Sequence, residues 1–201
     1  MSKFSTSPNW ALASHNAGKI KELNALLTPH GLTIKGATEL GFAEPEETEK
    51  TFTGNAILKA KAACEASGLV SLADDSGLSV DGLDGAPGIY SARWAGEPRD
   101  FDRAMAKVEE ELRARKTQDF GAQFVCVLAL AHPDGEVRTY EGIVRGHLEF
   151  PPRGTAGFGY DPIFVPQEET RTFAEMSAEE KRRFSHRGRA FDLLMSDIFN
   201  S

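Results

Sequence analysis

In the first half of the chain, short apolar segments alternate with stretches in which apolar residues recur at helical spacing. The first pattern predicts strands and the second predicts helices. Three short segments predict strands: 10–14, which is expected to be buried, 32–35 and 69–73. Apolar residues repeating at helical spacing over 20–27 predict a helix between the first two strands. A second such repeat over 52–64 predicts another helix, with Thr51 or Thr53 as its N-cap. This order is typical of an α/β sheet.

The second half adds a hairpin to these helical repeats. Residues 101–112 have the pattern of an amphipathic helix. Two extended runs, 123–131 and 136–144, are joined by His-Pro-Asp-Gly and predict a β-hairpin. Ser177 and Glu180 form a capping box that opens a C-terminal helix. Two Gly-rich segments predict ordered loops of the kind that carries function: 82–96 and 154–162. Together the elements predict a mixed α/β sheet.

Composition narrows the class of protein. The 201 residues are 40% hydrophobic and 26% charged, which fits one domain, or two lobes around one cleft, with a self-sufficient core. The formal net charge of −7 argues against stable binding to nucleic acid. Cys64 and Cys126 lie in apolar surroundings without CxxC spacing, which favours a reducing intracellular compartment.

No segment predicts membrane insertion or export. The longest apolar run, 124–131, is eight residues and is too short to span a bilayer. The first residues, Met-Ser-Lys-Phe-Ser-Thr-Ser-Pro, lack the apolar core of a signal peptide. We therefore expect a cytoplasmic protein with no membrane partner.

The first candidate site is six consecutive residues at the end of the first strand: Ser14, His15, Asn16, Ala17, Gly18 and Lys19. A strand end, a small-residue turn and a helix N-terminus present free backbone N–H groups and the positive end of a helix dipole, which favour phosphate. Lys19 would add a full positive charge. The spacing is not that of the Walker A loop, GxxxxGK[ST]. The alternative is an ordinary strand-to-helix turn.

A pair of carboxylates is the second candidate, in Asp74-Asp75-Ser76-Gly77 at the end of the third strand. Because adjacent strand residues face opposite sides, one Asp would point into a cleft and the other into supporting structure. We assign Asp75, which is nearer the turn, to the cleft, where it could bind Mg²⁺ or accept a proton from water. Two alternatives stay open: a plain turn, and an aspartic protease, which needs two such carboxylates where this chain has one copy of the motif.

Aromatic and basic residues late in the chain supply the third and fourth candidates. Residues 158–161, Phe-Gly-Tyr-Asp, suit a flat heterocycle, with stacking worth roughly 1–3 kcal/mol per base, unless the two rings are simply core. Lys181, His186 and Arg187 lie on different faces of any continuous helix. They can serve one site only if the helix breaks near 185–188; otherwise they are solvated basic residues.

Taken in order, these segments resemble the inosine triphosphate pyrophosphatase family, also called XTP/dITP diphosphatases or non-standard purine nucleotide pyrophosphatases. The resemblance runs from about Trp10 to Phe199. Six segments carry it: SHNAGK at 14–19, TFTGNAILKA at 51–60, ADDSGL at 73–78, GAPGIYSARW at 85–94, GFGYDPIF at 157–164 and SHRG at 185–188. One departure is that many members begin the first motif Thr-Gly-Asn, so His15 replaces a glycine.

The resemblance implies a fold, a reaction and a partner. The fold is two lobes on a long mixed β-sheet with flanking helices and an active-site cleft between the lobes, in a single domain over residues 1–201 and usually a homodimer. The reaction is Mg²⁺-dependent hydrolysis of a purine nucleoside triphosphate to the monophosphate and pyrophosphate. The preferred substrates are ITP, dITP and XTP, so the role is to clear non-standard nucleotides before polymerases use them.

The resemblance also assigns roles to individual residues. Asp75 is expected to activate water and, with Glu46, to hold the magnesium. Glu44, Glu47 and Glu49 crowd Glu46, so a neighbouring Glu is open as the second ligand. The residues expected to bind the substrate are Ser14, His15, Asn16, Ala17, Gly18, Lys19, Lys59, Ser76, Phe158, Gly159, Tyr160, Asp161, Lys181, His186 and Arg187.

Elementary energetics support this chemistry. A carboxylate about 4 Å from a phosphate charge is repelled by about 4 kcal/mol at an effective dielectric of about 20, so carboxylates beside a triphosphate require a cation. A 6-oxo purine offers an acceptor to Lys181 or Arg187, whereas adenine presents a donor there, and two facing donors cost about 1–3 kcal/mol. This argument separates ITP from ATP but not from GTP. A purine nucleotide-binding module without catalysis remains the main alternative function, although both carboxylate positions are filled.

Overall fold

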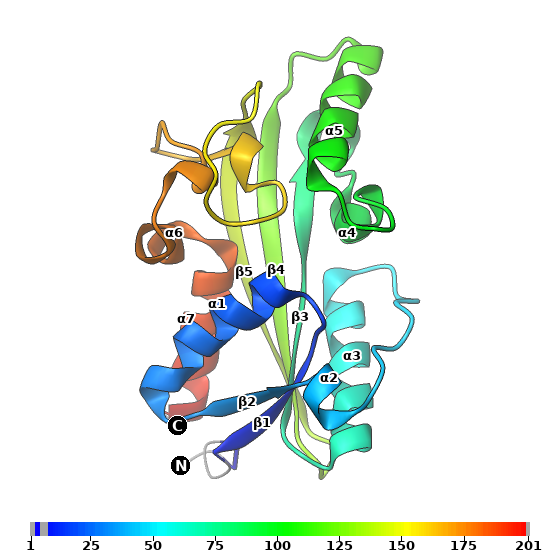
Figure 1. Cartoon of the computed structure of the whole chain (residues 1–201), viewed down its shortest axis with the longest axis vertical. Coiled ribbons are helices and arrows are strands. Elements are labelled where there is room, and N and C mark those ends of the chain that lie inside the picture. Colours follow the sequence, from blue (N-terminus) through cyan, green and yellow to red (C-terminus); the bar gives the residue numbers. More distant parts are fainter. Residues whose placement is uncertain (1–2, 5–7, 200–201) are drawn as a thin grey trace. The chain divides into compact units, whose positions relative to one another are not determined.

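The computed structural model describes residues 3, 4 and 8–199. Within this part of the chain, six strands form one mixed sheet in the order β2-β1-β3-β4-β5-β6 (Figure 1). The strands are β1 (Asn9–Ala13), β2 (Thr33–Gly36), β3 (Ser71–Val80), β4 (Gly121–Ala131), β5 (Val137–Leu148) and β6 (Phe164–Pro166). β1 pairs in parallel with β2 and β3, whereas β5 pairs antiparallel with β6. The predicted mixed α/β sheet with flanking helices is confirmed.

The helices are of very different lengths. The α-helices are α1 (Ala17–Leu27), α2 (Ala37–Leu40), α3 (Phe52–Ser67), α4 (Ser91–Trp94), α5 (Phe101–Arg115), α6 (Ala178–Phe184) and α7 (His186–Phe199). Short 3-10 helices cover Thr28–His30, Asp81–Leu83, Gly88–Tyr90, Asp161–Ile163 and Phe173–Glu175. In the described residues, no helix has both the length and the apolar character that a membrane crossing needs.

The chain divides into two compact units. The first unit comprises residues 1–75, 127–141 and 190–201, and the second comprises residues 76–126 and 142–189. The division cuts β3 between Asp75 and Ser76. That both units form a single domain, with a cleft between two lobes, stays a prediction.

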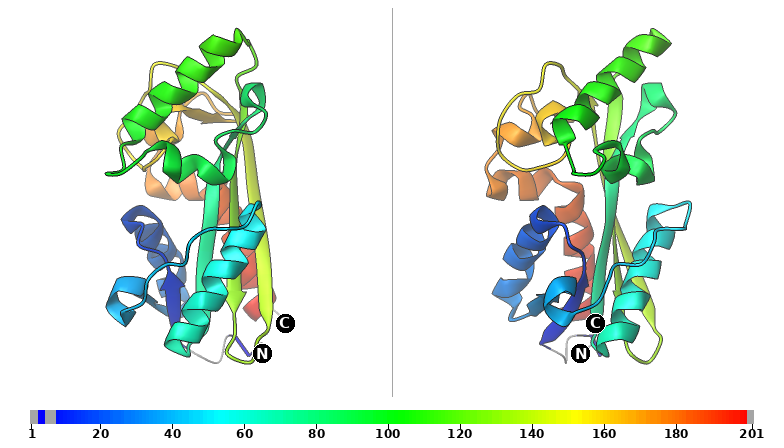
Figure 2. Two further views of the ribbon diagram at one scale, coloured as in Figure 1. Left: turned by 90° about the vertical axis from the view of Figure 1, so that its right-hand side faces the viewer. Right: turned by 45° about the vertical axis from the view of Figure 1, so that its right-hand side comes forward.

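In the first unit, helices flank the parallel strands. α3 packs against β1, and α1 packs against β2. Figures 1 and 2 show α1 and α3 on opposite sides of these strands. Trp10 and Leu12 on β1 are fully buried, as are Leu23 and Leu27 on the inner face of α1. Of the two predicted N-caps of α3, Thr51 is the one observed: its Oγ1 accepts a hydrogen bond from Gly54 N–H at 3.0 Å.

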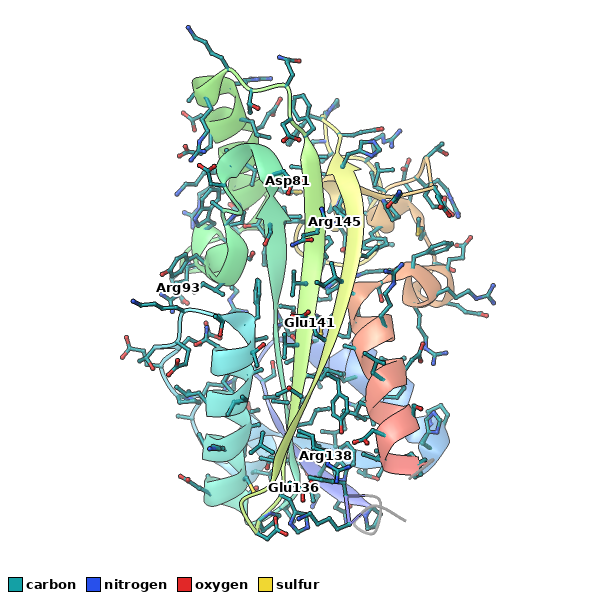
Figure 3. The ribbon with its side chains drawn as sticks, turned by 180° about the vertical axis from the view of Figure 1, so that it is seen from behind. Asp81, Arg93, Glu136, Arg138, Glu141 and Arg145 are labelled. Carbon is teal, nitrogen blue, oxygen red and sulfur yellow. The ribbon has the colours of Figure 1, made fainter. Side chains whose placement is uncertain are left out.

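The end of α7 is attached to β5 within the first unit. Arg138 Nη1 lies 2.8 Å from Asp197 Oδ2, and the Tyr140 hydroxyl donates to the same oxygen at 2.6 Å. Arg138 Nε also pairs with Glu136 Oε1 at 2.7 Å, and Figure 3 shows Arg138 beside the C-terminal helix. Burial and the Asp197 carboxylate raise the pKa of Tyr140. This network fixes the helix on the strand.

In the second unit, α5 and the late loops enclose an aromatic core. The predicted amphipathic helix is confirmed as α5, which buries Ala104, Met105, Val108 and Leu112. Phe124 on β4 contacts the rings of Phe164 and Phe173, with centroids 4.7 and 6.0 Å away. The candidate functional side chains of this unit pack against these rings.

Two elements differ from the sequence-based prediction. The strand expected over 69–73 runs on to Val80, so Asp74 and Asp75 lie inside a strand, and the alternative of a plain turn is wrong. Buried charges are tolerated there because each carboxylate has a lysine partner. β6 was not predicted because its three residues are too few to show a period.

Candidate functional site

The turn between β1 and α1 has the geometry of an anion-binding helix N-terminus. Asn16 is the N-cap, and its Oδ1 accepts a hydrogen bond from Lys19 N–H at 3.2 Å. Ser14 Oγ accepts from Asn16 N–H at 3.1 Å. The N–H groups of Ala17 and Gly18, in the first turn, have no acceptor four residues back within the helix. No acidic residue lies in the first turn of the helix itself.

His15 fits this turn because its side chain is exposed. The imidazole is 44% exposed, and its Nδ1 lies 3.3 Å from Glu44 Oε1. The same Glu44 oxygen accepts from His15 N–H at 2.5 Å. The replacement of the family's glycine therefore places no bulky group in the core.

Both carboxylates of β3 are buried and both pair with lysines. The side chains of Asp74 and Asp75 are 0% and 7% exposed. Lys19 Nζ lies 2.6 Å from Asp74 Oδ1, and Lys59 Nζ lies 2.7 Å from Asp75 Oδ1. The Asp74 carbonyl also accepts from Lys59 at 3.0 Å and from Lys19 at 3.3 Å. Asp74, assigned from the sequence to supporting structure, therefore contacts both lysines of the site.

A third carboxylate comes from the acidic loop before α3. Glu47 Oε1 lies 2.8 Å from Lys59 Nζ. Asn55 Oδ1 accepts from Glu49 N–H at 3.0 Å, which attaches this loop to the first turns of α3. Glu46 is exposed, so the structure brings Glu47 rather than Glu46 to the lysine, and a metal-binding role for Glu46 stays a prediction. We call the following residues the carboxylate cluster: Lys19, Glu47, Lys59, Asp74 and Asp75.

Burial and charge compete within the carboxylate cluster. Burial raises the pKa of Asp75 to about 6, and the nearby ammonium groups of Lys59 and Lys19 oppose this only in part. Burial also disfavours the charged form of Glu47, but Lys59 outweighs it and lowers the pKa of Glu47. For Lys59, burial is outweighed by Asp75 and Glu47, which raise its pKa. Lys59 is therefore charged at neutral pH, whereas Asp75 titrates close to the range in which a general base is effective.

The donor set of this cluster fits Mg²⁺. Asp75 Oδ2 is buried and has no hydrogen-bond partner among the described residues. Such an oxygen is costly unless something satisfies it. Mg²⁺ uses one or two carboxylates and completes its shell with water and phosphate oxygens, as Asp75 and Glu47 would allow. Nowhere in the described residues do three or more His, Cys, Asp or Glu side chains group so as to hold a metal ion by themselves.

The second unit contains the helix break on which the basic residues depend. α6 ends at Phe184 and α7 begins at His186, with Ser185 extended at ψ 150°. Gly188 N–H donates to Ser185 Oγ at 3.0 Å. A Cβ on Gly188 would lie 2.1 Å from the carbonyl oxygen of Arg182, so this close turn requires glycine. The break near 185–188, which is the condition for the three basic residues to serve one site, is therefore present.

Lys181 and Asp161 form a buried ion pair at 2.7 Å. The same Asp161 oxygen accepts from Phe158 N–H at 2.8 Å, so one carboxylate orders both the loop and the lysine. Lys181 Nζ lies 5.0 Å from the centroid of the Phe158 ring, and the Arg187 guanidinium carbon lies 5.7 Å from it. Both cations thus interact with the same aromatic ring.

His186 and Arg187 are buried beside other residues of this unit. The His186 ring stacks on Phe124, with centroids 4.7 Å apart and planes inclined by 10°. Arg187 is 2% exposed, and its Nη2 donates to Ser76 Oγ at 3.0 Å. We call the following residues the aromatic and basic cluster: Ser76, Phe158, Asp161, Lys181, His186 and Arg187. The structure therefore brings together residues that the sequence placed in three separate motifs.

The ring of Tyr160 packs in the core and is not placed to bind a ligand. Its side chain is buried in the hydrophobic core, and its hydroxyl donates to the Ser91 carbonyl oxygen at 2.8 Å. Its ring meets Phe101 edge to face at 5.6 Å. The alternative of core packing thus holds for the ring of Tyr160. Contact of Gly159 and Tyr160 with substrate stays a prediction.

Two residues of these clusters, and Phe124 beside His186, were not assigned to a site from the sequence. Asp74 was considered as one of a pair, but its partner Lys19 lies 55 positions away. Glu47 is one of several acidic residues in a loop without periodicity. Phe124 belongs to an apolar strand run and has no signal that separates it from core.

Comparisons with known proteins identify the family of this chain. A model of the Ham1 family matches residues 10–197. A dITP/XTP pyrophosphatase of Zymomonas mobilis is 54% identical over 186 residues, covering 92% of this chain and 89% of the relative. A dITP/XTP pyrophosphatase of Gluconobacter oxydans is 53% identical over 201 residues, covering 100% of this chain and 96% of the relative.

A solved structure of a HAM1 protein from Coxiella burnetii superposes on this chain with a TM-score of 0.88 at 38% identity. The match covers 97% of this chain and 100% of the other. The resemblance seen in six sequence segments is confirmed by these matches, which extend over nearly the whole length. The chain therefore belongs to the Ham1 family.

Proposed function

We propose that this chain hydrolyses non-standard purine nucleoside triphosphates, ITP, dITP and XTP, to the monophosphate and pyrophosphate with Mg²⁺ as cofactor. The relatives support the coarser statement directly: the chain is a hydrolase that acts on anhydride bonds of nucleoside triphosphates. One observation carries the finer proposal. Asp75 is a buried carboxylate with one oxygen on Lys59 and the other without a hydrogen-bond partner among the described residues.

The first unit is suited to the polyphosphate. The N–H groups at the start of α1 and the ammonium groups of Lys19 and Lys59 are donors for phosphate oxygens. Asp75 Oδ2 would accept a proton from the water that attacks the α-phosphorus, with pyrophosphate as the leaving group. Lys59, hydrogen-bonded to Asp75 Oδ1, holds this carboxylate in one orientation.

Asp75 and Glu47 are the residues that would hold Mg²⁺. When bound, this ion would withdraw charge from the phosphate oxygens and offset the carboxylates beside them. Lys59 bridges the same two carboxylates in the structure and keeps them close to each other. The chain therefore presents a preformed pair of ligands.

The second unit is suited to the base. Phe158 offers an aromatic face, and Lys181 and Arg187 offer donors to the 6-oxo group of hypoxanthine or xanthine. Both donors are fixed by their own partners, Asp161 and Ser76. An amino group in place of the 6-oxo acceptor would face fixed donors, which supports discrimination against ATP.

The test supplies ITP, XTP, dGTP and ATP in turn, with Mg²⁺ and with a chelator, and separates the products by ion-exchange chromatography. We expect IMP or XMP together with pyrophosphate, only when Mg²⁺ is present, and slow turnover of ATP. Reaction in ¹⁸O-labelled water should place the label in the monophosphate, since attack is at the α-phosphorus. Label in the pyrophosphate, or release of orthophosphate, would reject the proposed reaction.

Two other results, one from nucleotide binding and one from a peptide assay, would identify the alternatives. Tight binding of ITP without turnover would establish a purine nucleotide-binding module that lacks catalysis. Metal-independent cleavage of peptides at acid pH would establish the protease. The proposal includes a cytoplasmic homodimer without stable nucleic acid or membrane binding, which sedimentation analysis and cell fractionation would check.

A further inference from the structure

Asp74 has no role in the proposed reaction, yet it contacts both lysines of the carboxylate cluster. We propose that Asp74 is a positioning residue that fixes Lys19 and Lys59 as one preformed pair of charges for the phosphates. This inference rests on the proposed function and deepens it. Its basis is the meeting of two ammonium groups on a single residue in the interior of β3.

The two lysines come from different elements, and both donate to the carbonyl oxygen of Asp74. Lys19 lies in the first turn of α1, and Lys59 lies in the middle of α3. The Asp74 carbonyl oxygen accepts from Lys59 Nζ at 3.0 Å and from Lys19 Nζ at 3.3 Å. Two like charges sharing one acceptor repel each other, and the Asp74 carboxylate at 2.6 Å from Lys19 offsets this repulsion.

Lys19 is held at both of its ends. Its backbone N–H donates to the N-cap Asn16, and its ammonium group pairs with Asp74. A lysine side chain is otherwise flexible and loses conformational freedom when it binds an anion. Because the ordering already exists in the free protein, less of the binding free energy is lost when phosphate arrives.

Asp74 also affects the balance of charge within the carboxylate cluster. Asp74 pairs with Lys19 at 2.6 Å, whereas Asp75 and Glu47 pair with Lys59 at 2.7 and 2.8 Å. Without the Asp74 charge, Lys19 would be drawn closer to Asp75, which already attracts it, and would compete there with a metal ion and with the water proton. Asp74 therefore keeps Lys19 on the phosphates and Asp75 open.

A double-mutant cycle on Asp74 and Lys19 tests this role. Asp74→Asn keeps the size of the side chain and removes its charge, and we expect kcat/KM for ITP to fall roughly 10- to 100-fold. Binding of inorganic pyrophosphate, measured by calorimetry with and without Mg²⁺, should weaken about 10-fold or more. In a Lys19→Met background the same Asp74 change should alter either quantity less than about 3-fold, since the residue acts through the lysine.

A matched control separates positioning from general structure. Asp197→Asn removes an ion pair with Arg138 elsewhere in the first unit and should lower stability without changing pyrophosphate binding. If Asp74→Asn alone does not fold, the double variant with Lys19→Met removes both charges, and its pyrophosphate affinity should equal that of Lys19→Met. An Asp74 effect that is just as large without Lys19, or no effect on pyrophosphate binding, overturns the proposal.

The readouts also separate this inference from the proposed function. A wild-type protein that binds pyrophosphate but hydrolyses no nucleotide would reject the hydrolysis and leave the binding cycle to decide on Asp74. A wild-type protein that binds no pyrophosphate at all would overturn the role of Asp74 as well.

Discussion

Each unit of the molecule contains a buried lysine–aspartate pair at the same distance, and the two pairs have different surroundings. Lys59 and Asp75 are 2.7 Å apart in the first unit, as are Lys181 and Asp161 in the second. The first pair lies among further carboxylates and a second lysine, whereas the second lies against aromatic rings. The comparison shows that neighbours, and not the pair itself, decide what chemistry an ion pair supports.

The difference lies in what each aspartate is left to do. Asp161 uses one oxygen for both Lys181 and the Phe158 N–H, so it orders a loop and a donor. Asp75 uses one oxygen for Lys59 and leaves the other without a hydrogen bond among the described residues. The first arrangement suits recognition of a flat ring, and the second suits metal binding and proton transfer.

The largest expected effect separates the two aspartates by kinetics. Asp75→Asn removes the proposed base and metal ligand, so we expect kcat for ITP to fall by roughly 10² to 10⁴. Asp161→Asn is the matched change in the second unit and should act mainly on KM, since it loosens Lys181. Steady-state kinetics on both variants check this. Equal losses of kcat in the two variants would erase the distinction.

The pH dependence of stability should differ next. Because burial raises the pKa of Asp75 from 3.8 to about 6, the folded protein holds this proton more tightly than the unfolded chain does between these values. Asp75 therefore lowers the free energy of unfolding as pH rises from about 4 to about 6, by at most about 3 kcal/mol. The stability of Asp75→Asn minus that of wild type, from denaturant unfolding without metal, should grow over this range. A difference that is constant with pH contradicts the assignment.

Base selection should depend on the second pair. Lys181→Met removes a charge-assisted donor at 2.7 Å from Asp161 and keeps the length of the side chain. We expect kcat/KM for ITP to fall about 10- to 100-fold, with a smaller loss for ATP. The reason is that the 6-oxo group of ITP accepts a hydrogen bond and would lose its donor, whereas the amino group of ATP would lose none. Parallel loss for both nucleotides would show that this lysine does not recognise the base.

A glycine beside Asp161 gives the smallest expected effect. Gly157 has φ +74°, and a Cβ there would lie 2.1 Å from Asp161 Oδ2. Gly31 has almost the same φ, +73°, with nothing within 4 Å of a Cβ. Gly157→Ala should therefore lower the free energy of unfolding by about 1 kcal/mol more than Gly31→Ala. Equal losses in chemical denaturation would show that the loop gives way without disturbing Asp161.

The parts of the fold that follow from local chemistry were predictable. The strand, turn and helix around Asn16 depend on neighbours in sequence, and so does the capping box at Ser177. The break at Ser185 was stated from the sequence as a condition for Lys181 and Arg187 to serve one site, and the structure contains it. Asp75 became a candidate because acidic residues after an apolar strand are informative in themselves, and its role stays a prediction.

The rest depends on contacts between distant residues. β3 continues through Asp74 and Asp75 because lysines from two helices neutralise them, and no local pattern announces those partners. Glu47 could not be preferred to Glu46, since an irregular loop has no period that says which side chain turns inward. The ring of Tyr160 packs in the core because its hydroxyl meets the Ser91 carbonyl, 69 positions away.

The two carboxylates proposed to hold the ion lie in different kinds of secondary structure. Asp75 is fixed in the interior of a strand, whereas Glu47 lies in a loop outside helices and strands. An ion held by both would therefore lose its loop ligand first, and exchange with solvent would proceed from that side while the strand ligand stayed in place. The rate of metal turnover would then be set by the acidic loop, and the loop could vary between relatives without moving the group that takes up the proton.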